Sequence, residues 1–184
     1  MALILAVGAA LLAACARSSS PLASAIGGPF RLVDQNGNAR DQRLLRGKWT
    51  ALYFGYTFCP DVCPTTLTAL GQAQKALGGA ARKIQFVFVT VDPARDTPGQ
   101  LKTYLSSPAF PAGTIGLTGS PAAIAQIAQA YHVYYRKVGT GPNYSMDHTS
   151  VVYLMRPDGR FAAPLDTTVP PPQIAAQITQ AMNA

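Results

Sequence analysis

The chain has 184 residues, 48% of them hydrophobic and 12% charged, and it carries a formal net charge of +7. This length suits one domain with its own hydrophobic core, and only three cysteines exclude a scaffold held by several disulfides. The positive charge either serves solubility or favours an acidic protein face or anionic lipid headgroups as partners. Because no run of Lys and Arg alternates with aromatic residues, we expect no nucleic-acid partner.

Residues 1–14 contain no charged or polar side chain. Their apolar run is shorter than the roughly 20 residues of a membrane-spanning helix and is typical of a signal peptide. The end of the run, Leu12-Ala13-Ala14-Cys15, resembles a bacterial lipobox, in which the cysteine becomes the lipid-modified first residue. We therefore predict a lipoprotein-type signal at 1–14, lipidation of Cys15 and a flexible tether at 15–28. An uncleaved anchor and a signal with an incidental cysteine are the alternatives.

Each of these alternatives places the domain outside the cytoplasm. We expect it in the bacterial cell envelope, anchored to the membrane on the periplasmic or outer side. Thiol pairs can be oxidised in such a compartment.

The first half of the remaining chain predicts a hairpin and then two strands around a helix. Residues 30–38 suggest a hairpin that turns at Asn36-Gly37, a favoured pair for a tight two-residue turn. Apolar runs at 49–54 and 84–91 predict buried strands. Between them, residues 65–77 place leucines on one side and end at a glycine pair, which predicts a helix.

The second half predicts two capped helices, further strands and a last helix. Thr97-Pro98 and Ser120-Pro121 each combine a capping side chain with a proline suited to the first turn. Strand-like residues at 133–138 and 150–155 flank a polar loop. The alternation of strands and helices predicts an α/β fold on the thioredoxin-like plan, with one domain over residues 29–184.

Cys59 and Cys63 follow the first predicted core strand, at the sheet edge where α/β folds bind ligands. Four residues make about one helical turn, so both sulfurs can point to one side near a helix start at Pro60 or Pro64. We expect the helix dipole there to lower the thiol pKa. The pair can form a disulfide or bind a soft metal such as copper or zinc. The three-residue spacer departs from the Cys-x-x-Cys redox signature.

The two histidines receive different predictions. His132 ends a predicted helix, where a surface position or a favourable helix-end charge is expected. His148 shortly precedes the strand at 150–155, and in a thioredoxin-like fold the loop before that strand faces the thiol pair. The pattern alone leaves two interpretations of His148 open, a third metal ligand or an exposed loop residue.

Further residues near the site have simpler expected roles. Asp92 and Asp96 are predicted as turn and cap residues, with a role in tuning the site left open. Met146 is expected to pack, or to supply a thioether ligand. Asp61 is expected to act as a charge at a helix N-terminus. Aromatic residues are expected to form core and site wall: Tyr53, Phe54, Tyr56 and Phe58.

Three motifs resemble those of one family. Residues 53–67 look like the signature of the Sco/SenC family, residues 89–98 resemble its second motif, and Asp147-His148 resembles its third. The resemblance covers about residues 29–183 and implies a thioredoxin-like fold with an extra β-hairpin, tethered to a membrane outside the cytoplasm. It also implies one copper ion per chain, Cu(I) or Cu(II), bound by Cys59, Cys63 and His148.

The family's role is assembly of the dinuclear copper centre in subunit II of cytochrome c oxidase. The resemblance therefore implies a copper chaperone rather than a catalyst. The alternative is a membrane-tethered thiol–disulfide oxidoreductase that reduces the cysteines of the copper acceptor, with Cys59 and Cys63 as its redox-active pair. The two roles can coexist, and copper is favoured because a pure redox protein needs no His148. A peroxidatic thiol enzyme is a weaker third hypothesis.

Overall fold

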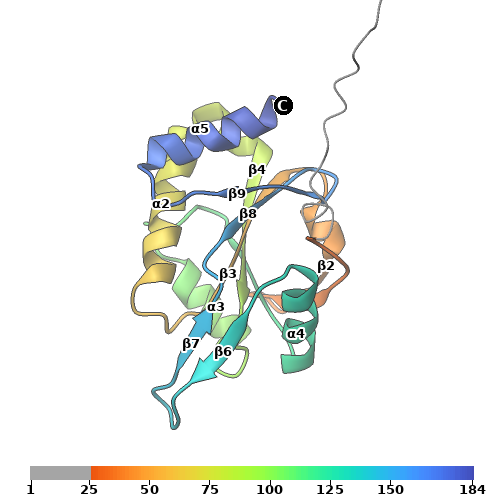
Figure 1. Cartoon of the computed structure of the whole chain (residues 1–184), viewed down its shortest axis with the longest axis vertical. Coiled ribbons are helices and arrows are strands. Elements are labelled where there is room, and N and C mark those ends of the chain that lie inside the picture. The colour runs from red at the N-terminus through yellow and green to blue at the C-terminus, as the bar shows by residue number, and fades with distance from the viewer. Residues whose placement is uncertain (1–25) are drawn as a thin grey trace, which may run out of the picture.

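The computed structural model describes residues 26–184. The predicted signal at 1–14, Cys15 and most of the predicted tether lie outside the described residues. A mixed sheet runs through the middle of the domain, with helices on both of its faces (Figure 1). Within residues 26–184, no helix combines the length and the apolar character needed to span a bilayer.

The main sheet of the described chain has seven strands. Their order across the sheet is β2 (Ala39–Asp41), β1 (Arg31–Asp34), β5 (Ile115–Thr118), β4 (Ile84–Thr90), β3 (Trp49–Gly55), β8 (Val152–Met155) and β9 (Phe161–Leu165). Strands β5, β4 and β3 run parallel, and the other neighbours pair antiparallel. A separate two-stranded sheet pairs β6 (Tyr135–Val138) with β7 (Ser145–His148). This is the thioredoxin-like α/β fold with an extra hairpin.

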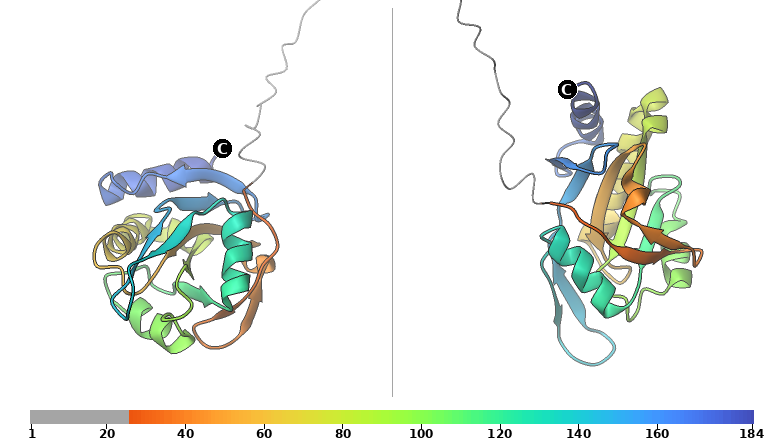
Figure 2. Two further views of the ribbon diagram at one scale, coloured as in Figure 1. Left: turned by 60° about the horizontal axis from the view of Figure 1, so that its bottom comes forward. Right: turned by 90° about the vertical axis from the view of Figure 1, so that its right-hand side faces the viewer.

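The helices divide between the two faces of the sheet. Helices α2 (Val62–Ala76), α3 (Pro98–Leu105) and α5 (Pro171–Met182) lie on one face, and α4 (Pro121–Ala130) lies on the other (Figure 2). Helices α2 and α3 share a face because the connections β3–α2–β4 and β4–α3–β5 step in the same direction, and such crossovers are right-handed. Short 3-10 turns complete the structure, η1 (Gln42–Leu45) and η2 (Gly78–Lys83).

The two predicted helix starts are confirmed. The Thr97 hydroxyl accepts a hydrogen bond from the Gln100 amide, and the Ser120 hydroxyl accepts one from the Ala123 amide. Each of these helices also begins with a proline. The caps satisfy amides that have no partner inside the helix, so each helix starts at a fixed residue.

The core lies against both faces of β3, whose residues from Thr50 onward are buried. Such a strand is a continuous apolar run in sequence, which explains why its position was predictable. Its Tyr53 ring packs edge to face on Phe88 of β4, with ring centroids 6.0 Å apart. Burial of side chains of this size contributes about 2–3 kcal/mol each. The strand is therefore a rigid base for the loop that follows it.

Three elements differ from the sequence prediction. Helix α2 begins at Val62, three residues before the predicted start, so Cys63 lies inside it. Strand β5 was missed because it is four residues long and contains Gly116, a residue depleted in strands. A Cβ at Gly116 would lie 2.5 Å from Leu105 Cδ1 and 3.3 Å from Leu101 Cβ, so α3 packs closely against this glycine. Strand β7 occupies part of the predicted polar loop, so His148 ends a strand.

Candidate metal centre

Three elements at one end of the molecule bring the predicted ligands together. Cys59 lies in the loop after β3, Cys63 is the second residue of α2, and His148 is the last residue of β7. This is the end where β7 and the start of α2 meet, the lower end in Figure 1. The two sulfurs and a ring nitrogen of His148 lie within 4.8 Å of one another. The fold thus gathers these residues although His148 is distant in sequence.

The two cysteines have unequal surroundings. Cys63 is fully buried, whereas Cys59 is 8% exposed. The Cys63 amide donates a hydrogen bond to Cys59 Sγ over 3.4 Å, because an amide in the first turn of a helix has no partner inside the helix. The Tyr53 hydroxyl donates to Cys63 Sγ over 3.6 Å. Cys59 is therefore the sulfur nearer to solvent, and Cys63 is the sulfur nearer to the core.

Burial raises the pKa of the Cys63 thiol to about 12. Loss of water disfavours the thiolate more strongly than hydrogen bonds from the Tyr56 backbone and the Tyr53 hydroxyl favour it. The prediction that the helix N-terminus lowers the thiol pKa is therefore wrong for Cys63. In the metal-free protein Cys63 is a neutral thiol at neutral pH, and a metal must displace its proton.

His148 presents one ring nitrogen to the sulfurs. Its Nε2 lies 3.6 Å from Cys63 Sγ, and its Nδ1 lies 3.0 Å from the Thr149 carbonyl oxygen. A carbonyl oxygen can only accept, so Nδ1 carries the proton and Nε2 keeps a lone pair directed toward the thiols. Burial also lowers the pKa of His148, which favours the neutral ring. Neutral imidazole is the form that binds metals.

Aromatic rings enclose the imidazole. The Tyr56 ring lies edge-on to His148 with centroids 5.8 Å apart, and the Tyr53 ring lies 6.4 Å away. Both tyrosines are buried, as their expected role in the site wall requires. Phe58, which was expected in the same wall, is instead 54% exposed beside Cys59. Tyr53 and Tyr56 therefore enclose the site on its protein side, and exposed Phe58 is an apolar residue on its solvent side.

The donor set fits one soft metal ion. Thiolate and imidazole are the ligands that copper and zinc prefer. Donor atoms within 4.8 Å of one another can converge on a single ion at metal–sulfur distances of about 2.3 Å. Three protein ligands leave a coordination position open, which is typical of sites that exchange ligands rather than of closed structural sites. The three residues therefore suit a single soft metal ion with a coordination position left open.

A buried carboxylate fixes the loop that carries Cys59. Asp96 accepts hydrogen bonds from the Thr57 amide at 3.0 Å, from the Thr57 hydroxyl at 2.6 Å and from the Thr90 hydroxyl at 2.6 Å. Burial raises the pKa of Asp96, although these donors favour its ionised form. The prediction that Asp96 caps a helix is wrong, because Thr97 is the cap. Asp96 instead ties the loop after β3 to the end of β4.

Arg95 connects this cysteine loop to the β6–β7 hairpin. Its side chain pairs with buried Asp92, and its Nη1 donates to the Tyr144 carbonyl oxygen over 2.9 Å. The guanidinium carbon lies 3.6 Å from the Tyr144 ring centroid and 4.7 Å from that of Phe58. The Tyr144 hydroxyl donates to Asp92 over 2.7 Å. One guanidinium thus holds the hairpin against the loop.

Other residues singled out in the sequence lie around the centre or away from it. Asp92 does form the predicted turn, since its carbonyl accepts the Arg95 amide, but its side chain holds the hairpin cluster. Met146 is buried, and its backbone forms a hydrogen bond with the Tyr56 hydroxyl. Asp61 is exposed at the start of α2, and His132 is exposed just after α4. Arg95 and Tyr144 had no predicted role.

A family model described as SCO1/SenC matches residues 18–183. The chain belongs to the SCO1/SenC family. It is 44% identical to "Protein SCO1 homolog 1, mitochondrial" of Arabidopsis thaliana over 140 residues, 75% of this chain and 41% of that protein. It is 40% identical to a SCO2-like protein of Rickettsia conorii over 139 residues, 74% of this chain and 67% of the relative. The chain thus spans less than half of the length of the Arabidopsis protein.

Solved SCO1/SenC structures share the fold. Bradyrhizobium japonicum ScoI with copper bound matches with a TM-score of 0.79 and 47% identity, over 85% of this chain and 99% of that chain. Yeast Sco1 with copper bound matches with a TM-score of 0.80 and 35% identity, over 87% of this chain and 90% of that chain. These relatives hold copper, and Cys59, Cys63 and His148 form a site in this chain whose donors suit that metal.

We predict that Gly55→Ala disturbs the centre of this SCO1/SenC protein. A Cβ at Gly55 would lie 2.9 Å from Cys63 Sγ and 2.9 Å from the Phe88 ring. Overpacking of this kind costs about 1–3 kcal/mol of the free energy of unfolding. Because one of the crowded atoms is a sulfur of the pair, copper affinity should fall as well. Denaturant unfolding and copper titration of the variant measure the two effects.

Gly79→Ala is the matched control, since the nearest atom to its Cβ would be 3.8 Å away. It should change neither quantity. Normal copper affinity in Gly55→Ala would show that Cys63 tolerates displacement.

We also predict that Arg95 positions the hairpin that carries His148. Arg95→Met leaves Asp92, whose side chain is 4% exposed, without its cation, which costs about 3 kcal/mol of the free energy of unfolding. Loss of a residue that orients a metal ligand weakens metal binding about 10–100-fold. Arg95→Lys keeps the charge but not the forked geometry, so it should restore stability more than copper affinity.

Arg136→Met is the control for this prediction, because the same hairpin carries the exposed Arg136–Asp147 pair. Unfolding and copper titrations of this variant should stay close to those of the unchanged protein. Equal losses in the two variants would contradict the role of Arg95.

Proposed function

We propose that this SCO1/SenC protein binds one copper ion and delivers it to the dinuclear copper centre of cytochrome c oxidase subunit II. The observation that carries the proposal is the convergence of Cys59, Cys63 and the lone pair of His148 Nε2 on one point. Copper in the structures of ScoI and yeast Sco1, at 47% and 35% identity, supports the choice of metal. The family's part in oxidase assembly supports the choice of acceptor.

The ligand set suits a carrier of copper in both oxidation states. Cys59 and Cys63 would supply thiolates, which by themselves hold Cu(I). His148 would add a nitrogen, which Cu(II) prefers. Cys59 at the solvent side of the pair is the ligand that an acceptor thiolate can replace first.

The experiment is a transfer assay between two purified proteins. Residues 26–184, loaded with copper, are mixed with the reduced, copper-free soluble domain of subunit II, and copper is measured in each after separation. We expect copper on the acceptor, and none on an acceptor variant whose copper-ligating cysteines are replaced by serine. Copper that stays on the donor would refute delivery, and copper that reaches both acceptors alike would show non-specific exchange.

The same proposal includes attachment of the chain to a membrane through a lipid on Cys15. The support is the lipobox-like sequence at its apolar N-terminal segment. Expression of the full chain should give a product in the membrane fraction whose mass includes the lipid. The Cys15→Ser variant should lack the added mass of the lipid. A full chain whose mass includes no lipid would exclude lipidation of Cys15.

A second candidate function is reduction of a disulfide in the copper acceptor. The observation that favours it is the proximity of two free cysteines, with the Cys63 amide donating to Cys59 Sγ. The Cys59 thiolate would attack the acceptor disulfide and release one acceptor thiolate. Cys63 would then attack Cys59 Sγ, which releases the second acceptor thiolate and leaves a Cys59–Cys63 disulfide. The two electrons come from the two thiols of this protein.

The raised pKa of Cys63 makes the second attack slow at neutral pH, since the thiolate is the nucleophile. Mixing reduced, copper-free protein with an oxidised acceptor distinguishes the two functions. Two new acceptor thiols per molecule, formed faster than copper is transferred, would favour the reductase. Copper transfer to an acceptor that is already reduced would favour the chaperone.

A further inference from the structure

The end of the sheet opposite the metal centre carries seven of the fourteen Lys and Arg residues in the described chain. Strands β3 and β4 run parallel, so the residues that precede both strands lie at the end away from the thiols. Strand β8 runs antiparallel to β3, so the residues that follow β8 lie at this same end. We call this surface the basic end. Its cations are Arg46, Lys48, Lys75, Arg82, Lys83, Arg156 and Arg160, all exposed.

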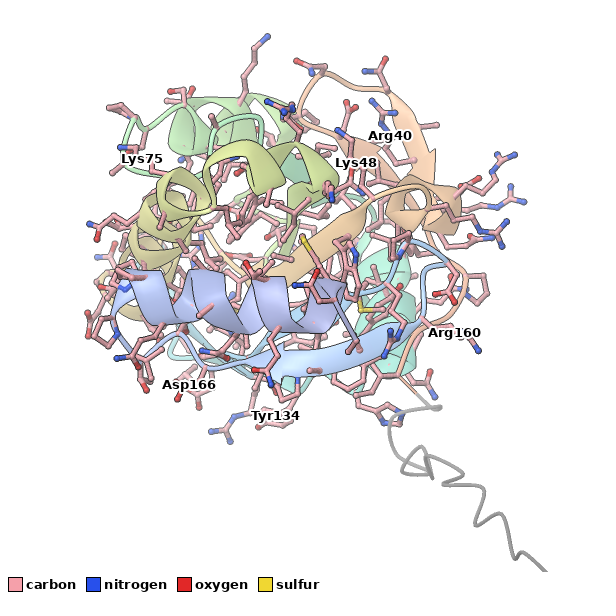
Figure 3. The ribbon with its side chains drawn as sticks, turned by 90° about the horizontal axis from the view of Figure 1, so that it is seen from above. Arg40, Lys48, Lys75, Tyr134, Arg160 and Asp166 are labelled. Atoms are coloured by element: carbon pink, nitrogen blue, oxygen red, sulfur yellow. The ribbon has the colours of Figure 1, made fainter. Side chains whose placement is uncertain are left out.

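Strand register and contacts relate the segments of the basic end: Trp49 pairs with Ile84, so Lys48 and Lys83 precede neighbouring strands. Arg46 forms a β-bridge with Asp158, and the Gly47 amide donates to the Pro157 carbonyl oxygen over 2.8 Å. The Arg156 guanidinium lies 5.8 Å from the Trp49 ring centroid. Figure 3 looks down on this end and labels three of its cations, Lys48, Lys75 and Arg160. Lys75 is there because α2 starts at the metal centre and ends at the opposite side.

The two ends differ in charge balance. In the part of the chain that the structure describes, the segments that carry these seven cations contain a single acidic side chain, Asp158, which pairs with Arg160. At the metal end, cations and carboxylates nearly balance: Arg95, Arg136 and Lys137 against Asp61, Asp92, Asp96 and Asp147. The positive field of the protein is therefore directed away from the metal site.

The chain leaves the described domain at this same end. The Gly27 amide donates to the Ala130 carbonyl oxygen over 2.9 Å, at the C-terminus of α4. Gly28 lines a small surface pocket together with Arg46 and Arg160. The sequence that precedes these glycines is the predicted tether, and before it come Cys15 and the apolar run 1–14. A membrane reached by this tether faces the basic end first.

We infer that the basic end binds anionic lipid headgroups and so holds the copper site pointing away from the bilayer. This rests on the membrane attachment in the proposed function and adds an orientation to it. Each exposed Lys or Arg near an anionic membrane increases the affinity of the protein for that membrane about fivefold. The attraction acts only within the screening distance of about 8–10 Å. Helix α2 has 15 residues and is about 22 Å long, so the site stands about that far from the headgroups.

The test uses residues 26–184, which lack the apolar segment and Cys15. This part folds alone in the family, since the solved ScoI chain is covered over 99% of its length by 85% of this chain. We expect it to sediment with vesicles of phosphatidylcholine and phosphatidylglycerol, and not with phosphatidylcholine alone. Binding should weaken steeply as salt is added.

The deciding variant is Lys48→Gln, Arg82→Gln and Lys83→Gln combined. Loss of three cations should weaken binding to the anionic vesicles about a hundredfold. The matched control, Lys102→Gln, Arg136→Gln and Lys137→Gln, loses the same charge outside the basic end and should bind nearly as well as the unchanged protein. Equal losses in both variants would overturn the inference, because net charge alone would then explain binding.

Two further outcomes bear on the proposal. Binding to an acidic protein surface, with none to anionic vesicles, would overturn it in favour of a protein partner. Vesicle-bound protein should bind copper with the same affinity and at the same rate as free protein. Slower copper uptake by the vesicle-bound protein would place the site against the bilayer. The Lys48→Gln, Arg82→Gln, Lys83→Gln variant should bind copper normally. Failure of lipid binding with intact copper transfer would therefore refute the orientation and leave the proposed function standing.

Discussion

His148→Asn is expected to weaken Cu(II) binding by more than about a hundredfold and Cu(I) binding far less. Loss of groups that merely orient a ligand already costs about 10–100-fold, so loss of the ligand itself costs more. The difference between oxidation states arises because two thiolates suffice for Cu(I), whereas Cu(II) prefers nitrogen donors. Competition titrations with chelators for each oxidation state measure the two affinities, and electron paramagnetic resonance reports nitrogen coordination of Cu(II).

His132→Asn is the matched control, because this exposed histidine has a φ of 54°, a conformation that asparagine tolerates. It should leave both affinities unchanged. If His148→Asn retains its Cu(II) affinity and its nitrogen signal, His148 is not a ligand and the proposed site loses its third member.

Copper affinity is expected to rise with pH, about tenfold per pH unit for each thiol proton that copper displaces. Burial raises the pKa of Cys63 to about 12, so below that pH the metal-free protein carries this proton and releases it on binding. Protons therefore compete with copper, and affinity falls as pH falls. The lowered pKa of His148 keeps its ring neutral, so its protonation adds to this loss only in acid.

Cu(I) titrations across the neutral and mildly alkaline range, together with proton release measured in weak buffer, test this dependence. Cys63→Ser has no thiol proton at this position and should lower both the affinity and the slope with pH. An affinity independent of pH would mean that the thiols are already ionised, in conflict with the burial of Cys63.

Local sequence patterns predicted the elements of the fold that depend on neighbouring residues. The buried strands β3 and β4 are continuous apolar runs, and Thr97 and Ser120 cap the helices that their sequences indicate. The thiol pair was also placed correctly, after the first core strand and next to a helix start. These features depend on short-range sterics and on apolar periodicity, which a sequence shows directly.

Features that depend on tertiary packing were not predictable in this way. The pKa of Cys63 rises because the folded protein removes it from water, and this outweighs the helix N-terminus that the sequence indicated. Within residues 26–184, strand β7 pairs only with β6. Its sequence shows no clear alternation of apolar and polar residues, so the residues before His148 looked like a loop. The role of Arg95 depends on Tyr144, which lies 49 positions away. Such contacts leave little trace in one sequence.

The hairpin that carries His148 is anchored differently from the elements that carry the two sulfurs. Strands β6 and β7 bond to each other and, among the described residues, to no strand of the main sheet. A two-stranded hairpin is only marginally stable by itself, so its place depends on side-chain anchors such as Arg95. The two sulfurs, by contrast, lie on the loop after β3 and on α2, which pack against the core of the main sheet. The third donor is therefore anchored less firmly than the other two, and its position depends on contacts outside any sheet of more than two strands.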